Sequence, residues 1–353
     1  MDKRELAGMA FEEIEDAVKE LGESRFRAKQ IYNWIMRSRR FDEMSNLSKA
    51  LRVKLSEQFI DQGVTIRESY LSKIDETEKF LYELKDGNLI EGVLMRYHHG
   101  DTLCVSTQVG CRMGCAFCAS TLDGCVRDLT AGEILGQVLA ANRHEQDKDP
   151  DRRVHNIVLM GSGEPLDNYD NVMRFLRLVN DERGLNISLR NISLSTCGLV
   201  PKMYRLSEEG LPVTLSVSLH APNDEVRKKL MPVANSYAIE DVIKACRHYV
   251  DKTGRRVIFE YALVGDVNCA LPMADELSRL LRGLQCHVNL IPLNEVKERS
   301  LRAPTTSEVE AFMERLKANG TSVTRRREMG DDINGACGQL RKHVLDEANK
   351  KEE

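Results

Sequence analysis

The stretch Cys111-Arg-Met-Gly-Cys115-Ala-Phe-Cys118 places three cysteines within eight residues, with the spacing C-x3-C-x2-C. Three thiolates so close along a chain can cover one face of a compact inorganic core. Structural zinc sites have four tetrahedral ligands, so zinc would need a fourth thiolate, for which Cys104 and Cys125 are candidates. Ferredoxin-type clusters also use four cysteines, at a different spacing. Three cysteines instead leave one iron of a [4Fe–4S] cluster open, and an open iron can bind and reduce a ligand.

Downstream of the cysteines, helical and strand patterns alternate, which indicates a parallel sheet or a full or partial barrel. In such folds ligands bind beyond the carboxyl ends of the strands, and polar residues stand at several predicted strand ends. The predicted helices are 131–143, 169–180, 202–209, 239–252, 271–282 and 306–319. The predicted strands are 156–160, 192–194, 213–219, 257–264, 287–291 and 321–325.

Upstream of the cysteines the pattern changes twice. Residues 1–66 have apolar residues at helical spacing and are predicted to form helices. Residues 80–84, 89–97 and 103–108 are predicted strands, and Asp86-Gly87-Asn88 is a hairpin turn signal.

Composition limits the class of protein. The chain has 353 residues, 42% hydrophobic and 30% charged, which predicts a globular protein of two or three domains, or of one large domain with an appendage. A net charge of -4 argues against a protein that coats DNA by charge alone. No apolar run reaches the length of a membrane span and no secretory signal is present, so we expect a cytoplasmic protein without a membrane segment. In a reducing cytosol, the ten cysteines are not expected to form a disulfide framework.

One region departs from the acidic balance of the chain. Residues 25–54 carry nine Lys and Arg against Asp42 and Glu43, a local charge of +7. Two interpretations stay open at this point: a solvated helix face, or a small module that contacts phosphates.

Several motifs in order along the chain resemble those of one family, the radical S-adenosylmethionine (SAM) RNA methyltransferases of dual specificity that methylate adenine at C2. The resemblance covers residues 10–342. Ser162 and the run Ala119-Ser120-Thr121 depart from the common family pattern, but none of them is a cluster ligand. The matching motifs are Phe26–Ile31 with Trp34, Cys104–Cys111, the cysteine triplet, Gly163–Asn168, Leu194–Thr196, Ser218–Asp224, Asn289–Asn294 and Gly330–Leu340.

The resemblance implies a fold and a division of the chain. The fold expected is α/β, a partial (βα)6 radical-SAM barrel with a small N-terminal helical domain and a short β extension. The expected domains are an RNA-recognition domain at 1–66, a β-hairpin extension at 67–103, the methyltransferase core at 104–340 and a charged tail at 341–353. The implied substrates are 23S rRNA, at the peptidyl transferase centre, and tRNA, at the adenine beside the anticodon.

The resemblance also assigns a catalytic set. Cys337 takes a methyl group from one SAM, and a second SAM, bound to the cluster, yields a radical that activates this methyl for addition to adenine C2. Glu91 is the matching position for the base that removes the C2 proton. Cys104 then attacks Cys337 and releases the product, leaving a transient disulfide. Competing interpretations are a buried structural cysteine at 337 or 104 and a solvated surface carboxylate at 91.

The remaining implied assignments concern cofactors and partners. One [4Fe–4S] cluster per chain has three ligands, Cys111, Cys115 and Cys118, and two SAM molecules are used per turnover. An external electron donor such as a flavodoxin or ferredoxin is expected, and the protein is expected to be a monomer. Cys125, Cys197, Cys246, Cys269 and Cys286 are interpreted as structural. His220 could equally be a satisfied core histidine. The positions that match SAM contacts are Gly163, Glu164, Ser195, Ser218, Leu219, His220 and Asn294.

Two alternative functions stay open at this level. A related group with the same catalytic cysteines methylates C8 of the same ribosomal adenine and confers antibiotic resistance. A zinc-stapled RNA-binding protein without catalysis would explain the basic helices and the clustered thiols, but not the polar strand ends or Cys337. Arg325–Arg327, just before Cys337, is predicted to contact RNA phosphates near the active site.

Overall fold

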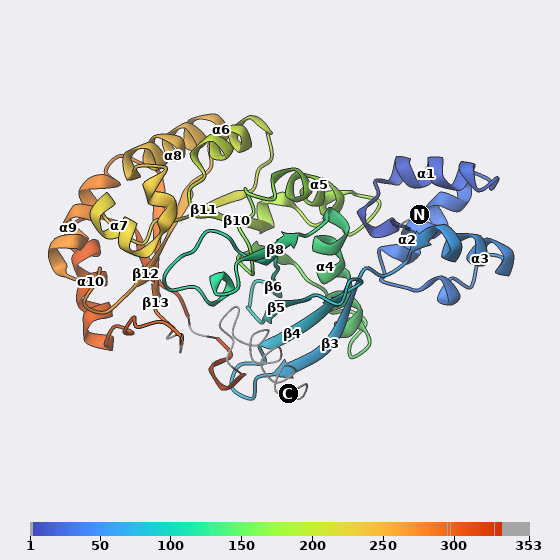
Figure 1. Ribbon diagram of the computed structural model, residues 1–353, viewed down its shortest axis with the longest axis horizontal. Helices are drawn as coiled ribbons and strands as arrows, with labels where there is room; N and C mark the ends of the chain where they lie inside the picture. Colours follow the sequence, from blue (N-terminus) through green and yellow to red (C-terminus); the bar gives the residue numbers. More distant parts are fainter. Residues whose placement is uncertain (1–2, 295, 297, 328, 334–353) are drawn as a thin grey trace.

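The fold is built on one ten-stranded sheet that curves as an open barrel (Figure 1). The computed structural model describes residues 3–294, 296, 298–327 and 329–333. Strands β6 to β14 of this sheet are parallel, and β3, β4 and β5 extend it as an antiparallel ladder. Across the sheet the order is β14 (Val323–Arg325), β13 (Cys286–Pro292), β12 (Val257–Leu263), β11 (Thr214–Ser218), β10 (Ile192–Thr196), β9 (Asn156–Leu159), β6 (Thr102–Cys104), β5 (Leu89–Met95), β4 (Glu78–Leu84) and β3 (Val64–Leu71).

Helices join successive parallel strands and cover the outer side of the sheet (Figure 1). This arrangement confirms the predicted partial barrel. Local sequence explains where helices start: the Thr130 hydroxyl accepts the Glu133 N–H at 3.0 Å, and the Glu133 carboxylate accepts the Thr130 N–H at 2.9 Å. The helices are α4 (Ala131–Gln146), α5 (Tyr169–Asn180), α6 (Val200–Glu208), α7 (Asp224–Leu230), α8 (Ile239–Thr253), α9 (Leu271–Leu280) and α10 (Thr306–Ala318).

The structure departs from the sequence prediction in several places, among them the following. Strand β3 begins at Val64, inside the region predicted to be helical, and its outer residues are largely exposed. The short helix α7 was not predicted. The predicted strand 103–108 ends at Cys104, and the chain forms a separate strand β7 (Gln108–Gly110), which pairs antiparallel with β8 (Cys125–Asp128). The β7–β8 pair frames the cysteine loop, so this correction bears directly on the site.

The N-terminal residues form a helical module, as predicted. It contains α1 (Phe11–Glu20), α2 (Phe26–Ile35) and α3 (Lys49–Gln58), with a short parallel pair between β1 (Arg4–Glu5) and β2 (Phe59–Ile60). The helices bury the apolar positions that recur at helical spacing: Ile14, Val18, Ile31, Ile35, Leu51 and Leu55. None of the helices in the described part of the chain combines the length and apolar character that a membrane crossing requires.

Register places two of the predicted catalytic residues on one face of the sheet. Cys104 lies opposite Val93 of β5 and Val158 of β9. Side chains alternate along a strand, so Glu91, two residues before Val93, faces the same side as Cys104.

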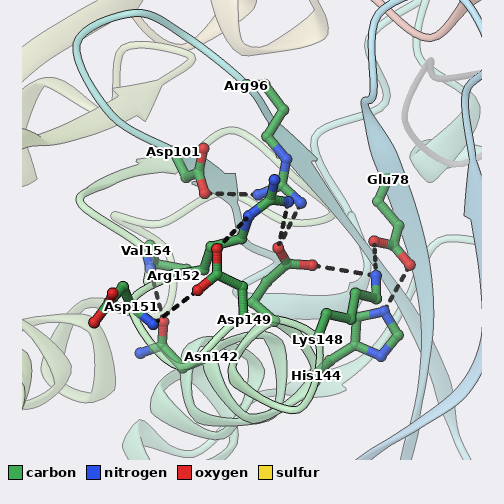
Figure 2. Close-up of polar contacts among 11 residues, drawn as sticks. Glu78, Arg96, Asp101, Asn142, His144, Lys148, Asp149, Asp151, Arg152 and Val154 are labelled. Atoms are coloured by element: carbon green, nitrogen blue, oxygen red, sulfur yellow. Dashed lines mark hydrogen bonds and ion pairs between the residues drawn. The ribbon is translucent and has the colours of Figure 1, made fainter.

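A network of ion pairs connects the end of α4 to β4 and to the segment after β5 (Figure 2). Glu145 is buried, and its carboxylate accepts hydrogen bonds from the Arg96 guanidinium at 2.5 Å and from Nζ of Lys148 at 3.3 Å. Glu78 is also buried and contacts His144 at 2.7 Å and Lys148 at 2.8 Å. The ligand atoms of Glu78, His144 and Glu145 lie within 4.8 Å of one another, a distance compatible with a metal ion. However, Lys148 already bridges the two carboxylates, so we interpret this cluster as structural.

Candidate active site

A cavity of about 280 Å³ lies at the carboxyl ends of the parallel strands. Its wall combines the cysteine loop with residues that end or follow β9, β10, β11 and β13. Nine residues predicted from the sequence line it: Cys111, Cys115, Cys118, Gly163, Glu164, Ser195, Ser218, His220 and Asn294. Leu219, the tenth, is fully buried, is not among the lining residues, and donates its backbone N–H to the Glu260 carbonyl at 3.1 Å.

The cysteine loop is held by backbone hydrogen bonds at both ends. Cys111 donates its N–H to the Gly124 carbonyl at 2.8 Å, and Ala116 donates to the Leu230 carbonyl of α7 at 2.8 Å. Gly110 has φ of 79°, and a Cβ there would lie 2.0 Å from the Gly124 carbonyl oxygen, so only glycine fits. The loop is therefore fixed in shape by its surroundings.

The number and spacing of the three cysteines fit a cluster better than a single zinc ion. Burial raises the pKa of Cys111 to about 12 and also raises the pKa of Cys115, so both favour the neutral thiol unless a metal supplies positive charge. A structural zinc site has four tetrahedral ligands, whereas three thiolates suit a [4Fe–4S] cluster that keeps one iron open for a ligand.

Neither of the two cysteines considered as a fourth zinc ligand, Cys104 and Cys125, lines the cavity. Cys104 packs with Val93 and Met95 on the sheet and, like Cys125 of β8, is absent from the cavity wall. Thus neither candidate joins the three cysteines around the cavity.

The loop after β9 presents a buried carboxylate to the cavity. Gly163 has φ of 107°, and a Cβ there would lie 2.7 Å from the Gln108 backbone nitrogen, which explains the glycine. Glu164 accepts the N–H of Cys197 at 2.7 Å and of Leu166 at 3.0 Å. Burial raises the pKa of Glu164, against the lowering effect of these hydrogen bonds. A cationic group in the cavity, such as an amino group, would compensate this buried carboxyl.

His220 lies two residues beyond the end of β11 and has a left-handed backbone conformation, with φ of 57°. Its Nδ1 accepts the Ala262 N–H at 2.8 Å, and its carbonyl accepts Nδ2 of Asn268 at 2.8 Å. Burial lowers the pKa of His220 to about 3, so the ring stays neutral at physiological pH. The imidazole is thus engaged within the core, as one of the two sequence interpretations proposed, and the strained turn shapes the cavity.

The sequence prediction missed one carboxylate in the wall, Glu260 of β12. Arg326, from the run Arg325–Arg327 that was predicted to lie near the active site, also lines the cavity. Glu260 accepts Nδ2 of Asn289 at 3.0 Å, and burial raises its pKa, with Arg326 acting in the opposite direction. The sequence does mark Glu260, because it is the one charged residue in the otherwise largely apolar strand Val-Ile-Phe-Glu-Tyr-Ala-Leu.

Glu91 and Cys104 form a second patch beside the cavity. The Glu91 carboxylate is buried and pairs with Nζ of Lys79 at 3.1 Å, so it is not the solvated surface group considered above. Cys104 is 3% exposed. Met160 lines the cavity and also packs against the cluster that contains Cys104, which makes the patch and the cavity neighbours.

The segment that leads toward Cys337 docks near this patch. Met329 packs against the Cys104 cluster, and Gly330 donates its N–H to Asp75 Oδ2 at 2.9 Å. Asp332 accepts the Ser72 hydroxyl at 2.7 Å. Cys337 itself lies outside the described residues, so its approach to Cys104, with Cα atoms within about 7 Å, stays a prediction.

The basic N-terminal module is partly neutralised by its own acidic residues. Arg25 pairs with Glu15 at 2.6 Å, and Lys54 pairs with Glu23 at 3.0 Å. The geometry therefore agrees with the solvated-face interpretation at these two positions and leaves phosphate contact to the other basic side chains.

Comparison with known proteins adds family information. Residues 105–268 match the model of the Radical SAM superfamily, and residues 4–60 match the model of the ribosomal RNA large subunit methyltransferase N-terminal domain. A probable dual-specificity RNA methyltransferase RlmN of Clostridium novyi is 52% identical over 344 residues, 97% of this chain and 99% of that protein. A protein of the same description from Alkaliphilus metalliredigens is 51% identical over 353 residues, 100% of this chain and 99% of that protein.

A solved structure is also similar. The radical SAM methyltransferase from Sphaerobacter thermophilus superposes with a TM-score of 0.92 at 44% identity, and the match covers 95% of this chain and 98% of that one.

Proposed function

The chain belongs to the family of dual-specificity RNA methyltransferases within the radical SAM superfamily, and we propose that it methylates adenine C2 in two RNAs. The substrates are 23S rRNA, at the peptidyl transferase centre, and tRNA, at the adenine beside the anticodon. One observation carries the proposal: the cysteine triplet, Glu164, Ser195 and Ser218 converge on one cavity beside the buried Cys104.

The substrate atom explains why this cofactor set is needed. Adenine C2 is an electron-poor carbon between two ring nitrogens, so it does not attack the methyl group of SAM as a nucleophile. When bound, a [4Fe–4S] cluster on Cys111, Cys115 and Cys118 supplies one-electron cleavage of SAM to a 5′-deoxyadenosyl radical. Glu164 is placed to hold the amino group of SAM, and the ends of β10, β11 and β13 are placed to hold its remaining polar groups.

The chain's own residues perform the polar steps. Cys337 accepts a methyl group on its sulfur by displacement from SAM and presents it to the adenine. After the methyl-derived radical has added to C2, the Glu91 carboxylate accepts the proton from C2, and the one electron left on the adduct would return to the oxidised cluster, so that a closed-shell thioether links Cys337 to the adenine. Cys104 then attacks the sulfur of Cys337: a disulfide forms, the sulfur–carbon bond breaks, and its electron pair stays on the new substituent, which takes a proton. A thiol reductant must restore both cysteines before the next turnover.

RNA recognition is proposed for the basic N-terminal module at residues 1–66 and for Arg325–Arg327 at the mouth of the barrel. The target adenine must leave its stack to reach the cavity. We further propose one cluster and two SAM molecules per turnover, a flavodoxin or ferredoxin as electron donor, a monomeric state and a cytoplasmic location. The β extension at 67–103, the core at 104–340 and the tail at 341–353 complete the proposed domain division.

The test uses RNA from a strain that lacks its own C2 methyltransferase. Reconstituted protein, SAM and a reductant are incubated anaerobically with this RNA, and methylated nucleosides are measured by mass spectrometry. Cys337→Ala is the inactive variant. Cys286→Ala is the matched control, because Cys286 begins β13 and lies outside the cavity wall.

Each outcome has a distinct meaning. 2-Methyladenosine from the wild type and from Cys286→Ala, but not from Cys337→Ala, supports both the reaction and the nucleophile. Fractionation of the RNA then shows which substrate carries the mark. 8-Methyladenosine would place the chain with the C8 group. No methyladenosine from a preparation with a verified, reducible cluster would overturn the substrate assignment.

A further inference from the structure

Arg227, in the middle of α7, is a buried cation that forms no salt bridge with any residue that the structure describes. The residue is 0% exposed. Its guanidinium donates to the Cys197 carbonyl at 2.7 Å and to the Tyr237 carbonyl at 3.2 Å, and its Nε has no partner among the described residues. Asp224, one turn earlier, accepts the Ile239 N–H at 2.8 Å and does not reach Arg227 within 4.0 Å. Within the described part of the chain, the guanidinium is therefore stabilised by two backbone carbonyls and by no carboxylate.

Such an arrangement is costly without a nearby negative charge. Removing an ion from water costs several kcal/mol even after relaxation, and buried charges are normally paired or bound to a metal site. Lys79 of β4, the other buried Lys or Arg among the described residues, follows this rule, because it pairs with Glu91 at 3.1 Å. Arg227 differs, because no carboxylate in the described part of the chain lies within 4.0 Å of it, and a bound anionic group would supply the missing compensation.

The position of Arg227 indicates which group this is. Helix α7 lies directly behind the cysteine loop, since Leu230 of α7 accepts the Ala116 N–H at 2.8 Å. Cys115 packs in one apolar cluster with Val226 and Leu230, the neighbours of Arg227 on the same helix. Arg227 is itself fully buried on this helix, so a charge on the cysteine loop would act on it with little screening by water.

Arg227 also connects to the other half of the cavity. The same Cys197 peptide that accepts from Arg227 donates its N–H to the Glu164 carboxylate at 2.7 Å. The guanidinium, the Cys197 peptide and Glu164 therefore form one polar chain behind the cavity wall. Gly198 leaves room for this chain, because a Cβ there would lie 3.1 Å from Nη2 of Arg227.

We propose that Arg227 is the counter-cation of the iron–sulfur cluster and favours its reduction by one electron. The inference rests on the proposed cofactor. The three thiolates make the cluster negative, and the electron from the external donor adds one further negative charge. A fixed cation in a dry environment stabilises this added charge, because net charge and surroundings set the potentials of such clusters. Arg227 acts on the cluster from behind the loop and does not touch the substrate.

The experiment compares three variants after anaerobic reconstitution without RNA. Arg227→Gln keeps a donor for the Cys197 carbonyl but removes the charge, and Arg227→Lys keeps the charge. Arg255→Gln is the matched control, because Arg255 also caps a strand carbonyl, Val213 at 2.9 Å, but lies at the opposite ends of β11 and β12. Iron and sulfide per chain are measured first, followed by an EPR-monitored redox titration of the cluster.

In Arg227→Gln we expect the ratio of reduced to oxidised cluster at a fixed potential to fall at least tenfold, a shift of about 59 mV for one electron. Arg227→Lys and Arg255→Gln should stay within about threefold of wild type. Equal potentials in wild type and Arg227→Gln would overturn the inference and leave Arg227 a structural residue.

A second measurement covers the case in which Arg227→Gln loads poorly. Cluster loading should raise the melting temperature of the wild type more than that of Arg227→Gln, because only the wild type relieves an uncompensated charge. An equal gain in both proteins would contradict the inference. These readouts separate the two proposals: a wild type with a normal cluster and no methylated product refutes the function and leaves the role of Arg227 measurable. A wild type that binds no iron refutes the cofactor and this inference together.

Discussion

At the scale of single residues, the buried pair of Lys79 and Glu91 decides how the proposed base is presented. Both side chains are almost fully buried, at 0% and 7% exposure, and their charged atoms are 3.1 Å apart. In a buried pair, the loss of one partner leaves an uncompensated charge, whereas the loss of both partners removes the problem. The pair thus ties the carboxylate to one place on the sheet.

We expect Lys79→Met to lower the free energy of unfolding by about 3–5 kcal/mol, because the buried Glu91 carboxylate would lose the ammonium group that neutralises its charge. The double variant Lys79→Met/Glu91→Gln should recover more than half of this loss. Urea unfolding followed by circular dichroism measures both. Lys244→Met is the control, since Lys244 pairs with Asp241 in an exposed position and should cost less than about 1 kcal/mol. Additive losses in the double variant would contradict the coupling.

The residues that sequence reasoning found and missed differ in a physical way. Cys111, Cys115 and Cys118 are close along the chain, so their spacing alone predicts a common ligand. The roles of Lys79 and Arg227 depend on partners that are distant in the sequence and come close only in the folded chain. Lys79 pairs with Glu91 across the β4–β5 ladder, and Arg227 donates to the Cys197 carbonyl just after β10. Such pairs leave no local pattern in the sequence.

At the scale of elements, periodicity predicted the parallel half of the sheet well. Helix α5 has the predicted bounds, Tyr169–Asn180, because its apolar residues repeat every three or four positions along a full three turns. Helix α7, with seven residues, is too short for a period to stand out. Strand β3 was missed because it is an edge strand with one ladder and mostly exposed side chains, so little apolar alternation marks it.

The connection of α4 to β4 gives a pH-dependent prediction for these elements. Burial raises the pKa of Glu78, but its hydrogen bonds to Lys148 and His144 outweigh this and hold the pKa below the ordinary value (Figure 2). A carboxyl whose pKa is lowered by folding stabilises the protein at pH values above its ordinary pKa of 4.5. This stabilisation is lost as the pH falls through the pKa of the folded state. We therefore expect Glu78→Gln to cost roughly 1–3 kcal/mol at pH 7.

The difference between wild type and Glu78→Gln should shrink below pH 4.5, as Glu78 takes up its proton. Urea unfolding at pH 7, 5 and 4 measures this difference. Glu314→Gln, on the exposed pair with Lys317, is the control and should match wild type within about 0.5 kcal/mol. A constant difference across this range would show that Glu78 acts through packing and not through its charge.

At the scale of the whole molecule, the N-terminal helical module packs against the barrel through close contacts with α4. Oε2 of Glu5 contacts the Thr130 hydroxyl at 3.2 Å, and a Cβ on Gly132 would lie only 2.3 Å from the same oxygen. Arg174 of α5 donates to the Gly8 carbonyl at 2.8 Å. The module thus rests on the first turn of α4, and Glu5 is enclosed where the two parts meet.

Because Glu5 is enclosed, we expect the stability of the contact between the module and α4 to depend on pH. Burial, together with the charge of Glu133, raises the pKa of Glu5 to about 7 from its ordinary 4.5. For a carboxyl with a raised pKa, the stabilising contribution is complete below the ordinary value and is lost as pH rises through the folded-state value. At 1.36 kcal/mol per pKa unit, the loss between pH 5 and pH 9 amounts to at most about 3 kcal/mol. Glu5→Gln removes the ionising carboxyl and should make the stability of the contact between the module and α4 independent of pH over this range.

The single tryptophan of the chain offers a local probe for this change, because Trp34 lies on α2 of the module and donates its indole N–H to Asn46 at 2.7 Å. Urea unfolding followed by Trp34 fluorescence should show a transition that moves to lower urea from pH 5 to pH 9 in wild type, and stays fixed in Glu5→Gln. Glu20→Gln, on the exposed pair with Arg4, is the control and should follow wild type. Parallel pH profiles for wild type and Glu5→Gln would show that the module is held by apolar contact alone, and that Glu5 ionises without loosening it.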